Sequence, residues 1–277
     1  MVRHAVVTGA AGLLGRHIAT AFRDAGYRVT ALDRDVGSPD MVRADLTELH
    51  AAIDSIPGAD IIVHTAAIPR PVGYDGQVVF GTNMALMYNV LAAAEEARIP
   101  KLLYASSFST LGLPFAPAPV EVLHFPIGEE HPTAPQDVYA VTKLLGEEMV
   151  DAWHRRTGRP AASIRMPWIQ TPESFTHEVV PRRDTPGARL DLWAYVDGRD
   201  AAAAFLAAAE ASFTGHERYF ISAADTYSTV ETDTLLRQFY PDAERRSALP
   251  GHSALLSNDK AHALTGYTPR HSWRDYR

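Results

Sequence analysis

Three regularly spaced glycines, Gly9, Gly12 and Gly15, follow the apolar, strand-like residues 4–7 and lead directly into a helical pattern. In a strand–turn–helix unit, the first glycine allows a tight turn and the second lets the backbone approach a pyrophosphate. The third lets the helix pack closely on the strand, and the helix start favours a phosphate. Asp33 ends the next apolar segment, where a carboxylate can bond a ribose hydroxyl. The feature therefore predicts a dinucleotide-binding unit.

Short apolar segments alternate with helical patterns through the first two-thirds of the chain. This alternation predicts an α/β fold, a Rossmann doubly wound parallel sheet with a small C-terminal substrate-binding portion. We expect residues 1–166, with 190–211 returning to them, to form the NAD(P)-binding domain, and residues 167–189 and 212–277 to form the small portion. The expected strands are residues 4–7, 28–32, 41–43, 60–64, 101–105 and 161–165, with helices from 13, 47, 77 and 136.

Two irregular segments interrupt this alternation. Residues 113–135 contain six prolines, and residues 167–189 are rich in Pro, Arg and Thr. Ligands of doubly wound sheets bind beyond the carboxyl ends of the strands, where both segments emerge. We therefore expect them to form the substrate pocket. The alanine-rich run that follows is predicted to be a helix with Asp200 as its N-cap.

Composition excludes several classes of function. A net charge of −7 disfavours binding to nucleic acid or to an anionic membrane surface, and the longest apolar run, residues 201–209, is half the ~18 needed for a membrane span. Because a strand begins at the N-terminus, we expect no signal peptide. The chain has no cysteine, and its twelve histidines are scattered, so no metal site is expected. These features predict a cytoplasmic protein that acts on a small molecule.

Two further motifs carry chemistry. Tyr139 and Lys143 are spaced to share one face of a helix, where a fixed positive charge would lower the pKa of the phenol and suit it to acid–base work. Ser106 and Ser107 end a strand, where a hydroxyl could hold a substrate oxygen. Taken singly, the first pair also fits a solvated helix face, and the serines also fit a turn.

Taken together, these motifs give the sequence a resemblance to the extended short-chain dehydrogenase/reductases. That family includes NAD-dependent sugar epimerases, dehydratases and uronate dehydrogenases. The resemblance covers about residues 1–210 and lies in the order and spacing of Gly9-x2-Gly12-x2-Gly15, Asp33, Asp45-Leu46, Ala66-Ala67, Asn83, Ser106-Ser107, Tyr139-x3-Lys143, Arg165-Met166-Pro167 and Val196 to Ala201.

The resemblance implies roles for individual residues. Ser107 would orient the reacting oxygen, Tyr139 would be the acid–base, and Lys143 would lower the pKa of that phenol and bind the ribose. Asn83 would be structural. Substrate contacts would come from Ser107, Phe108, Trp168 and Arg182. The implied cofactor contacts are Gly9, Gly12, Leu13, Leu14, Gly15, Asp33, Arg34, Asp45, Leu46, Ala66, Ala67, Ala105, Ser106, Tyr139, Lys143, Pro167, Trp168 and Ile169.

The expected cofactor is NAD, because Asp33 repels a 2′-phosphate, while Arg34 and Arg16 leave NADP possible. The expected activity is hydride transfer between the nicotinamide and a secondary alcohol or ketone of a sugar-like or polyketide-like substrate. A nucleotide-sugar epimerase is the alternative, followed by a non-catalytic nucleotide sensor. Dehydration is not expected, because Phe108 and Ser109 stand where the family's dehydratases carry two acids. A homodimer through the two long helices is typical of the family.

Overall fold

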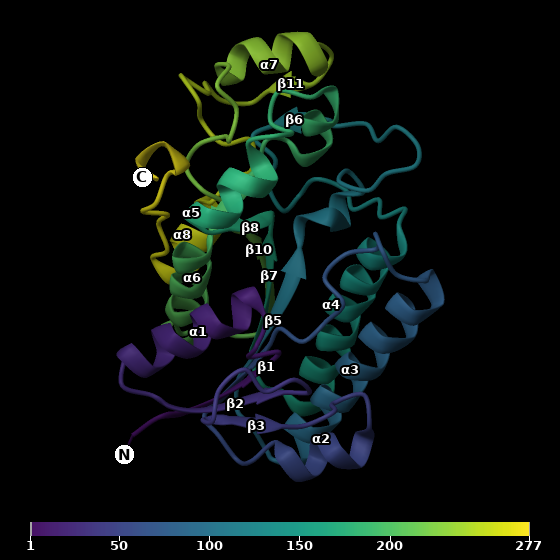
Figure 1. Cartoon of the computed structure of the whole chain (residues 1–277), viewed down its shortest axis with the longest axis vertical. Coiled ribbons are helices and arrows are strands. Elements are labelled where there is room, and N and C mark those ends of the chain that lie inside the picture. The colour runs from purple at the N-terminus through teal and green to yellow at the C-terminus, as the bar shows by residue number, and fades with distance from the viewer. Residues whose placement is uncertain (1, 277) are drawn as a thin grey trace.

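A seven-stranded parallel sheet forms the centre of the molecule (Figure 1). In the computed structural model, which describes residues 2–276, the strand order is β10-β7-β5-β4-β1-β2-β3. The direction of winding reverses between β1 and β4, which opens a crevice at their carboxyl ends. The predicted doubly wound sheet is confirmed. Its strands are β1 (His4–Thr8), β2 (Arg28–Asp33), β3 (Met41–Arg43), β4 (Ile61–His64), β5 (Leu102–Ser107), β7 (Ala161–Met166) and β10 (His216–Phe220).

Helices cover both faces of this sheet. Alternate side chains of β1 show the reason, because Ala5 and Val7 belong to one apolar cluster and Val6 to another. The first cluster lies under α1 (Leu13–Asp24), α6 (Gly198–Glu210) and α8 (Asp259–Thr265). The second lies under α2 (Leu49–Ser55), α3 (Gly76–Glu96) and α4 (Val138–Thr157). Figure 1 shows the two layers on opposite sides of the strands.

A second, smaller part lies beyond the carboxyl ends of the strands, at the top of Figure 1. A third apolar cluster, with Phe125, Tyr195 and Tyr227 fully buried, holds it together. Two small parallel sheets join its segments, β6 with β11 and β8 with β9. Its elements are η1 (Phe108–Leu111), β6 (His124–Phe125), β8 (Trp168–Gln170), α5 (Pro172–Ser174), the π-turn η2 (Phe175–Val179), η3 (Pro186–Asp191), β9 (Tyr195–Asp197), α7 (Thr232–Phe239), β11 (Glu244–Arg245) and η4 (Trp273–Asp275).

Two details of the sequence-based division need correction. Strand β10 was expected within the small portion, but it pairs with β7 and completes the central sheet. The N-cap of α6 is Asp197, whose carboxylate accepts from the Arg199 amide at 2.8 Å, and Asp200 lies inside the helix. Asp200 instead accepts hydrogen bonds from the C-terminal segment, which a local capping pattern does not reveal.

Within residues 2–276, none of the helices is both long and apolar enough to cross a membrane. The same range contains no group of three or more His, Asp or Glu side chains placed to hold a metal ion.

Candidate active site

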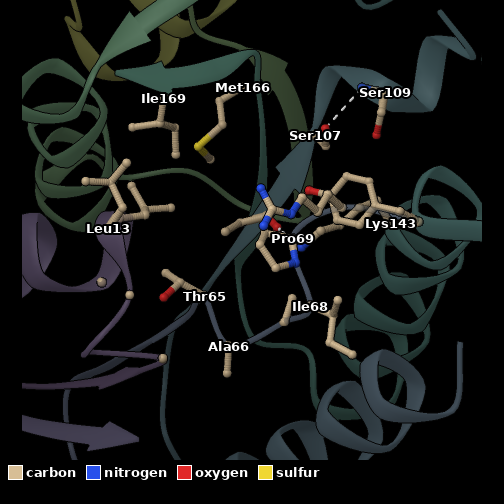
Figure 2. A pocket seen from close by; sticks show the side chains of 18 of the residues that line it. Leu13, Thr65, Ala66, Ile68, Pro69, Ser107, Ser109, Lys143, Met166 and Ile169 are labelled. Carbon is tan, nitrogen blue, oxygen red and sulfur yellow. Dashed lines mark hydrogen bonds between the residues drawn. The ribbon is translucent and has the colours of Figure 1, made fainter. Parts of the chain in front are cut away.

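One cleft, with a volume of about 940 Å³, follows the carboxyl ends of β1, β2, β4, β5 and β7. Its lining includes every residue that the sequence predicts for catalysis, cofactor or substrate, from Gly9 to Arg182. Figure 2 shows Leu13 and Ile169 on one side of the cleft and Ser107 and Lys143 on the other. The structure therefore brings together residues that lie up to 170 positions apart. Which of them touch a ligand stays a prediction.

The glycine turn at one side of the cleft has room only for glycine. Gly9 has a φ of +69°, and a Cβ there would lie 2.7 Å from the Ala66 Cα. A Cβ at Gly15 would overlap the carbonyl oxygen of Gly9. Among the described residues, no side chain caps α1 at Gly12, and the amides of Leu13 and Leu14 have no hydrogen-bond acceptor. A helix start left open in this way, with no acid in its first turn, fits the pyrophosphate of a dinucleotide.

Asp33 both holds the glycine turn and offers an acceptor to the cofactor. One carboxylate oxygen accepts from the Ala11 amide at 2.9 Å and the other from the Asp35 amide at 3.1 Å. The carboxylate thus holds the turn in place, and its remaining lone pairs can accept from a ribose hydroxyl. Arg34 is exposed and pairs with Asp35 at 3.2 Å, so its charge is partly compensated. This arrangement favours a cofactor without a 2′-phosphate.

The floor of the cleft is fixed by hydrogen bonds to backbone. Asn83, on α3, accepts from the Ile68 amide at 2.8 Å and donates to the Ile68 carbonyl and to Thr142. The structural role expected for Asn83 is confirmed by these bonds. Asp45 accepts two hydrogen bonds from Thr47, which lower the pKa of its carboxyl group. Neither residue needs a ligand to keep its place.

Tyr139 and Ser107 meet at the centre of the cleft. Burial raises the pKa of the Tyr139 phenol to about 12, the hydrogen bond with Ser107 acts in the opposite direction, and Asp137 raises it further. Ser107 ends β5, and its hydroxyl also accepts from the Ser109 amide at 3.1 Å, which fixes its rotamer. The phenol therefore holds its proton at neutral pH.

Lys143 lies one helical turn after Tyr139, with its ammonium 5.6 Å from the phenol ring centroid. It donates to the Ala105 carbonyl at 2.7 Å. Burial lowers the pKa of Lys143 to about 7, although the nearby Glu147 acts to raise it. The sequence predicted that Lys143 would lower the pKa of Tyr139, whereas in the protein without cofactor that pKa is raised overall, with burial as the largest cause. Burial, which a spacing pattern does not reveal, outweighs the lowering effect of the Ser107 hydrogen bond.

Sequence reasoning missed a buried ion pair directly behind these groups. Glu147, one turn beyond Lys143 on α4, is fully buried and pairs with Arg165 of β7 at 2.7 Å. It also accepts from the Ser106 hydroxyl at 2.5 Å. Ser106 was predicted to contact the cofactor, but its hydroxyl points to Glu147. The i, i+4 spacing from Lys143 was the available signal.

At the far end of the cleft, Trp168 and Arg182 lie together. The guanidinium of Arg182 sits 4.9 Å from the centre of the Trp168 ring and pairs with Asp191 at 2.7 Å. Burial raises the pKa of Asp191, and Arg182 opposes that rise. Of the aromatic residues near this end, Phe175 is buried in the third apolar cluster. The charge of Arg182, which the resemblance implies as a substrate contact, is therefore already compensated.

Several residues of this end had no sequence signal. Phe115, in the proline-rich segment, lies edge-on to the Tyr139 ring with centroids 6.5 Å apart, and it lines the cleft. Glu178 and Ser174 line it from the segment after β8. Long loops give no periodic pattern, so only the folded chain shows which of their side chains face the cleft.

A serine, a histidine and an aspartate also lie in hydrogen-bond order away from the cleft. The Ser163 hydroxyl is 2.7 Å from Nε2 of His216, and Nδ1 of His216 is 2.7 Å from Asp151. This is the order of a hydrolase triad. Ser163 lies on β7 with no exposed surface, so no substrate reaches its oxygen. The group joins β7, β10 and α4.

Comparison with known proteins identifies the chain's family. Residues 5–222 match the NAD dependent epimerase/dehydratase family. The chain belongs to this family. The predicted family is thus confirmed, and so is NAD as the cofactor expected from it. An enzyme of the extended short-chain dehydrogenase/reductase type fits both the family and the cleft.

Named relatives in the epimerase/dehydratase family include both dehydrogenases and epimerases. The chain is 29% identical over 179 residues to an L-arabinose 1-dehydrogenase (NAD(P)(+)) of Haloferax volcanii, covering 62% of this chain and 70% of that protein. It is 25% identical to a UDP-glucose 4-epimerase of Corynebacterium glutamicum, over 96% of this chain and 91% of that protein. A solved short-chain dehydrogenase/reductase superfamily protein from Agrobacterium tumefaciens, with bound NAD, superposes with a TM-score of 0.73 at 21% identity, covering 98% and 94% of the two chains.

Proposed function

We propose that the protein is an NAD-dependent dehydrogenase that oxidises a secondary alcohol of a small, hydroxyl-rich, sugar-like molecule or reduces the corresponding ketone. The observation that carries the proposal is the meeting of Ser107, Tyr139 and Lys143 in the cleft that the glycine turn of Gly9 and Gly15 borders. Such a set can hold a substrate oxygen and move its proton. When bound, the nicotinamide supplies the site that accepts or returns hydride.

Ser107, Tyr139 and Lys143 would hold the substrate oxygen and move its proton. The Ser107 hydroxyl, held by the Ser109 amide, bonds the substrate oxygen beside Tyr139. Tyr139 keeps its proton at neutral pH, so it donates to the oxygen of a ketone. In the oxidising direction a proton must leave the phenol. The Lys143 ammonium, 5.6 Å from the centre of the phenol ring, favours the phenolate electrostatically once that proton has left.

The charges at the far end support a neutral substrate. Arg182 is neutralised by Asp191, and the nearby Glu178 adds a negative charge. A nucleotide diphosphate needs uncompensated cations, whereas sugar hydroxyls can donate to these carboxylates. The ring of Trp168 offers a flat apolar surface of the kind on which sugar rings stack. We therefore favour a free sugar over a nucleotide sugar.

The proposal is tested by measuring NAD+ reduction with L-arabinose, D-galactose, D-glucuronate and a polyketide-like hydroxyketone. Turnover with a neutral sugar is expected. Tyr139→Phe should lower that turnover about 100-fold and leave the Kd of NADH unchanged. The matched control is Tyr88→Phe, an exposed tyrosine on α3. Unchanged turnover in Tyr139→Phe would remove the acid–base role.

A UDP-sugar 4-epimerase is the second candidate, because the similarity to such an enzyme extends over 96% of the chain. An epimerase would interconvert UDP-glucose and UDP-galactose with no net NADH, and it would retain NAD through purification. Chromatography of the UDP-sugar products separates the two functions.

We also propose that the protein is a cytoplasmic homodimer. The packed helices α3 and α4 expose four large apolar side chains, those of Val78, Phe80, Tyr88 and Leu145. A group of exposed apolar side chains of this kind is typical of a protein–protein interface. The absence of cysteine from the sequence suits a reducing compartment. Light scattering should give twice the monomer mass, and Tyr88→Glu should reduce it to the monomer mass.

A further inference from the structure

The far wall of the cleft is a segment with little internal support. Ser174, Glu178 and Arg182 face the cleft from residues 171–182, between β8 and η3. This stretch contains only the three-residue helix α5 and the five-residue π-turn η2. Helical turns of this length are not stable alone. Their position therefore depends on what packs behind them.

Phe175 is the point at which this wall is held from behind. Its side chain is 3% exposed and belongs to the third apolar cluster. The indole of Trp273 stacks on it with ring centroids 5.2 Å apart and planes 12° from parallel. Tyr276 lies edge-on to it at 5.5 Å, and Tyr195 of β9 lies against it at 5.7 Å. Two of its three aromatic neighbours therefore come from the C-terminal segment.

The same C-terminal segment also contacts the residue that directly follows the wall. The guanidinium of Arg183 lies 5.2 Å from the centre of a Trp273 ring. The adjacent residue, Arg182, faces the cleft. Trp273 thus contacts Phe175 at the start of η2 and Arg183 directly after the wall.

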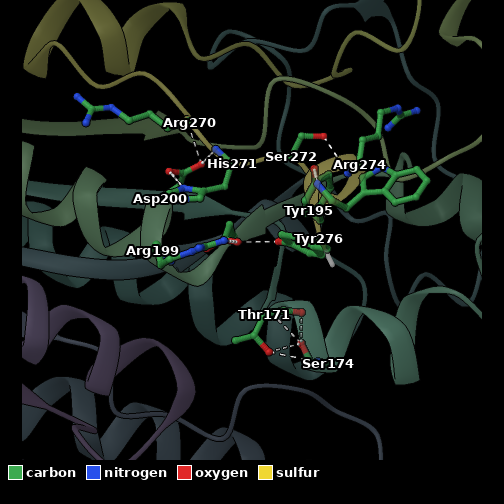
Figure 3. Close-up of polar contacts among 12 residues, drawn as sticks. Thr171, Ser174, Tyr195, Arg199, Asp200, Arg270, His271, Ser272, Arg274 and Tyr276 are labelled. Atoms are coloured by element: carbon green, nitrogen blue, oxygen red, sulfur yellow. Dashed lines mark hydrogen bonds and ion pairs between the residues drawn. The ribbon is translucent and has the colours of Figure 1, made fainter.

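Three aspartates, Asp200, Asp225 and Asp197, fix the C-terminal segment itself; Figure 3 shows Asp200 beside Arg270 and His271. Asp200 accepts from the amides of Arg270 and His271 at 2.9 and 2.8 Å and pairs with the His271 ring. Asp225 accepts from the hydroxyl of Ser272 and from Arg274, both at 2.7 Å.

The last contacts tie the segment to β9 and its neighbours. The Tyr276 hydroxyl donates to Asp197 at 2.7 Å, and the Trp273 amide donates to the Tyr195 hydroxyl at 2.8 Å. Asp197 and Asp200 are each 1% exposed, so these bonds form in a place that water scarcely reaches. Within residues 2–276, the hydrogen bonds of the tail thus go to the start of α6, to β9 and to residues 225–228, while its contacts with the wall are aromatic.

We propose that residues 270–276 position the substrate end of the cleft, with Trp273 transmitting the fixed position of α6 and β9 to the wall through Phe175. Trp273 is a positioning residue, since it lines no part of the cleft. The inference rests on the proposed function in one respect only, namely that this end of the cleft takes the substrate. It implies that loosening the tail weakens substrate binding and leaves the dinucleotide end intact.

The test compares Trp273→Ala with two other variants of the full chain. Trp273→Phe keeps the stack on Phe175 and loses the indole bond to the Thr226 carbonyl. Phe239→Ala is the matched control, because Phe239 belongs to the same apolar cluster but packs on Trp193, with centroids 5.4 Å apart. Each variant is measured by hydrogen–deuterium exchange, by the Kd of NADH, and by KM and kcat for the sugar that gives turnover.

In Trp273→Ala, amide exchange in residues 171–182 should rise, and KM should increase about tenfold while kcat and the Kd of NADH stay close to wild type. Trp273→Phe should restore most of the wild-type KM. Unchanged exchange in residues 171–182, or an equal KM rise in Phe239→Ala, overturns the proposal. If wild type turns over none of the sugars, the proposed function fails, and the exchange measurement still decides the role of the tail.

Discussion

Replacing the buried lysine of the cleft with methionine should make the protein more stable while abolishing its activity. Lys143 is 4% exposed, and its pKa falls from the ordinary 10.5 to about 7 because burial penalises the ammonium. At pH 6, holding that charge inside the fold costs about 5 kcal/mol. Methionine of similar length removes the charge and loses one hydrogen bond, to the Ala105 carbonyl, worth about 1–2 kcal/mol. The expected net gain in the free energy of unfolding is about 3 kcal/mol.

The gain should depend on pH in a defined direction. Between the folded pKa of about 7 and the unfolded value of 10.5, the unfolded chain binds more protons than the folded one, so wild-type stability rises with pH. At pH 9 the remaining cost is about 2 kcal/mol, which the lost hydrogen bond cancels. The advantage of Lys143→Met should therefore be largest at pH 6 and near zero at pH 9.

Urea denaturation at pH 6, 7.5 and 9 without cofactor measures this difference. Lys101→Met is the matched control. The Lys101 ammonium donates to the carbonyls of Ala208, Ala209 and Ala211 at 2.7, 3.0 and 2.6 Å, in the last turn and at the C-cap of α6. Because burial also lowers the pKa of Lys101, to about 8, removing its charge offsets the loss of three bonds, and the stability of that variant at pH 6 should stay within about 1 kcal/mol of wild type. A Lys143→Met protein that is less stable than wild type at pH 6, or whose gain does not change with pH, refutes the reasoning.

Two further predictions concern the dinucleotide end. Gly15→Ala forces a Cβ onto the Gly9 carbonyl and should weaken NADH binding about 30-fold, which calorimetry can measure. The control is Gly81→Ala, at an open position of α3. It should leave the Kd of NADH unchanged and add about 1 kcal/mol to the free energy of unfolding. Asp33→Asn keeps an acceptor for the Ala11 amide and removes the charge, so the preference for NAD over NADP should fall about fivefold to tenfold. An equal loss of both cofactors would contradict the ribose assignment.

The parts of the molecule that depend on local chemistry were predictable from the sequence. The glycine turn, the strand ends and the spacing of Tyr139 and Lys143 follow from backbone sterics and helical period, and the structure places all of them at one cleft. Asp200 shows the limit of such local reasoning, because a nearby aspartate three positions earlier takes the cap. A capping pattern ranks candidates but does not fix the first helical residue.

Properties that depend on burial or on distant partners were not predictable. The direction of the Tyr139 pKa reverses because the phenol is buried, which its neighbours in sequence do not show. The compensation of Arg182 by Asp191 depends on how η3 turns back toward the wall. The stack of Trp273 on Phe175 joins residues about 100 positions apart, and nothing in either local pattern points to the other.

The sealed trio of Ser163, His216 and Asp151 shows that solvent access, and not side-chain order, separates a nucleophile from a structural hydroxyl. Its distances match those required for proton transfer from serine to histidine. Yet burial lowers the pKa of His216, and the Ser163 hydroxyl is fully buried, so an electrophile cannot reach its oxygen. A fluorophosphonate reagent, which labels the serine of active hydrolases, should therefore leave the folded protein unmodified and react with Ser163 only if strands β7 and β10 separate.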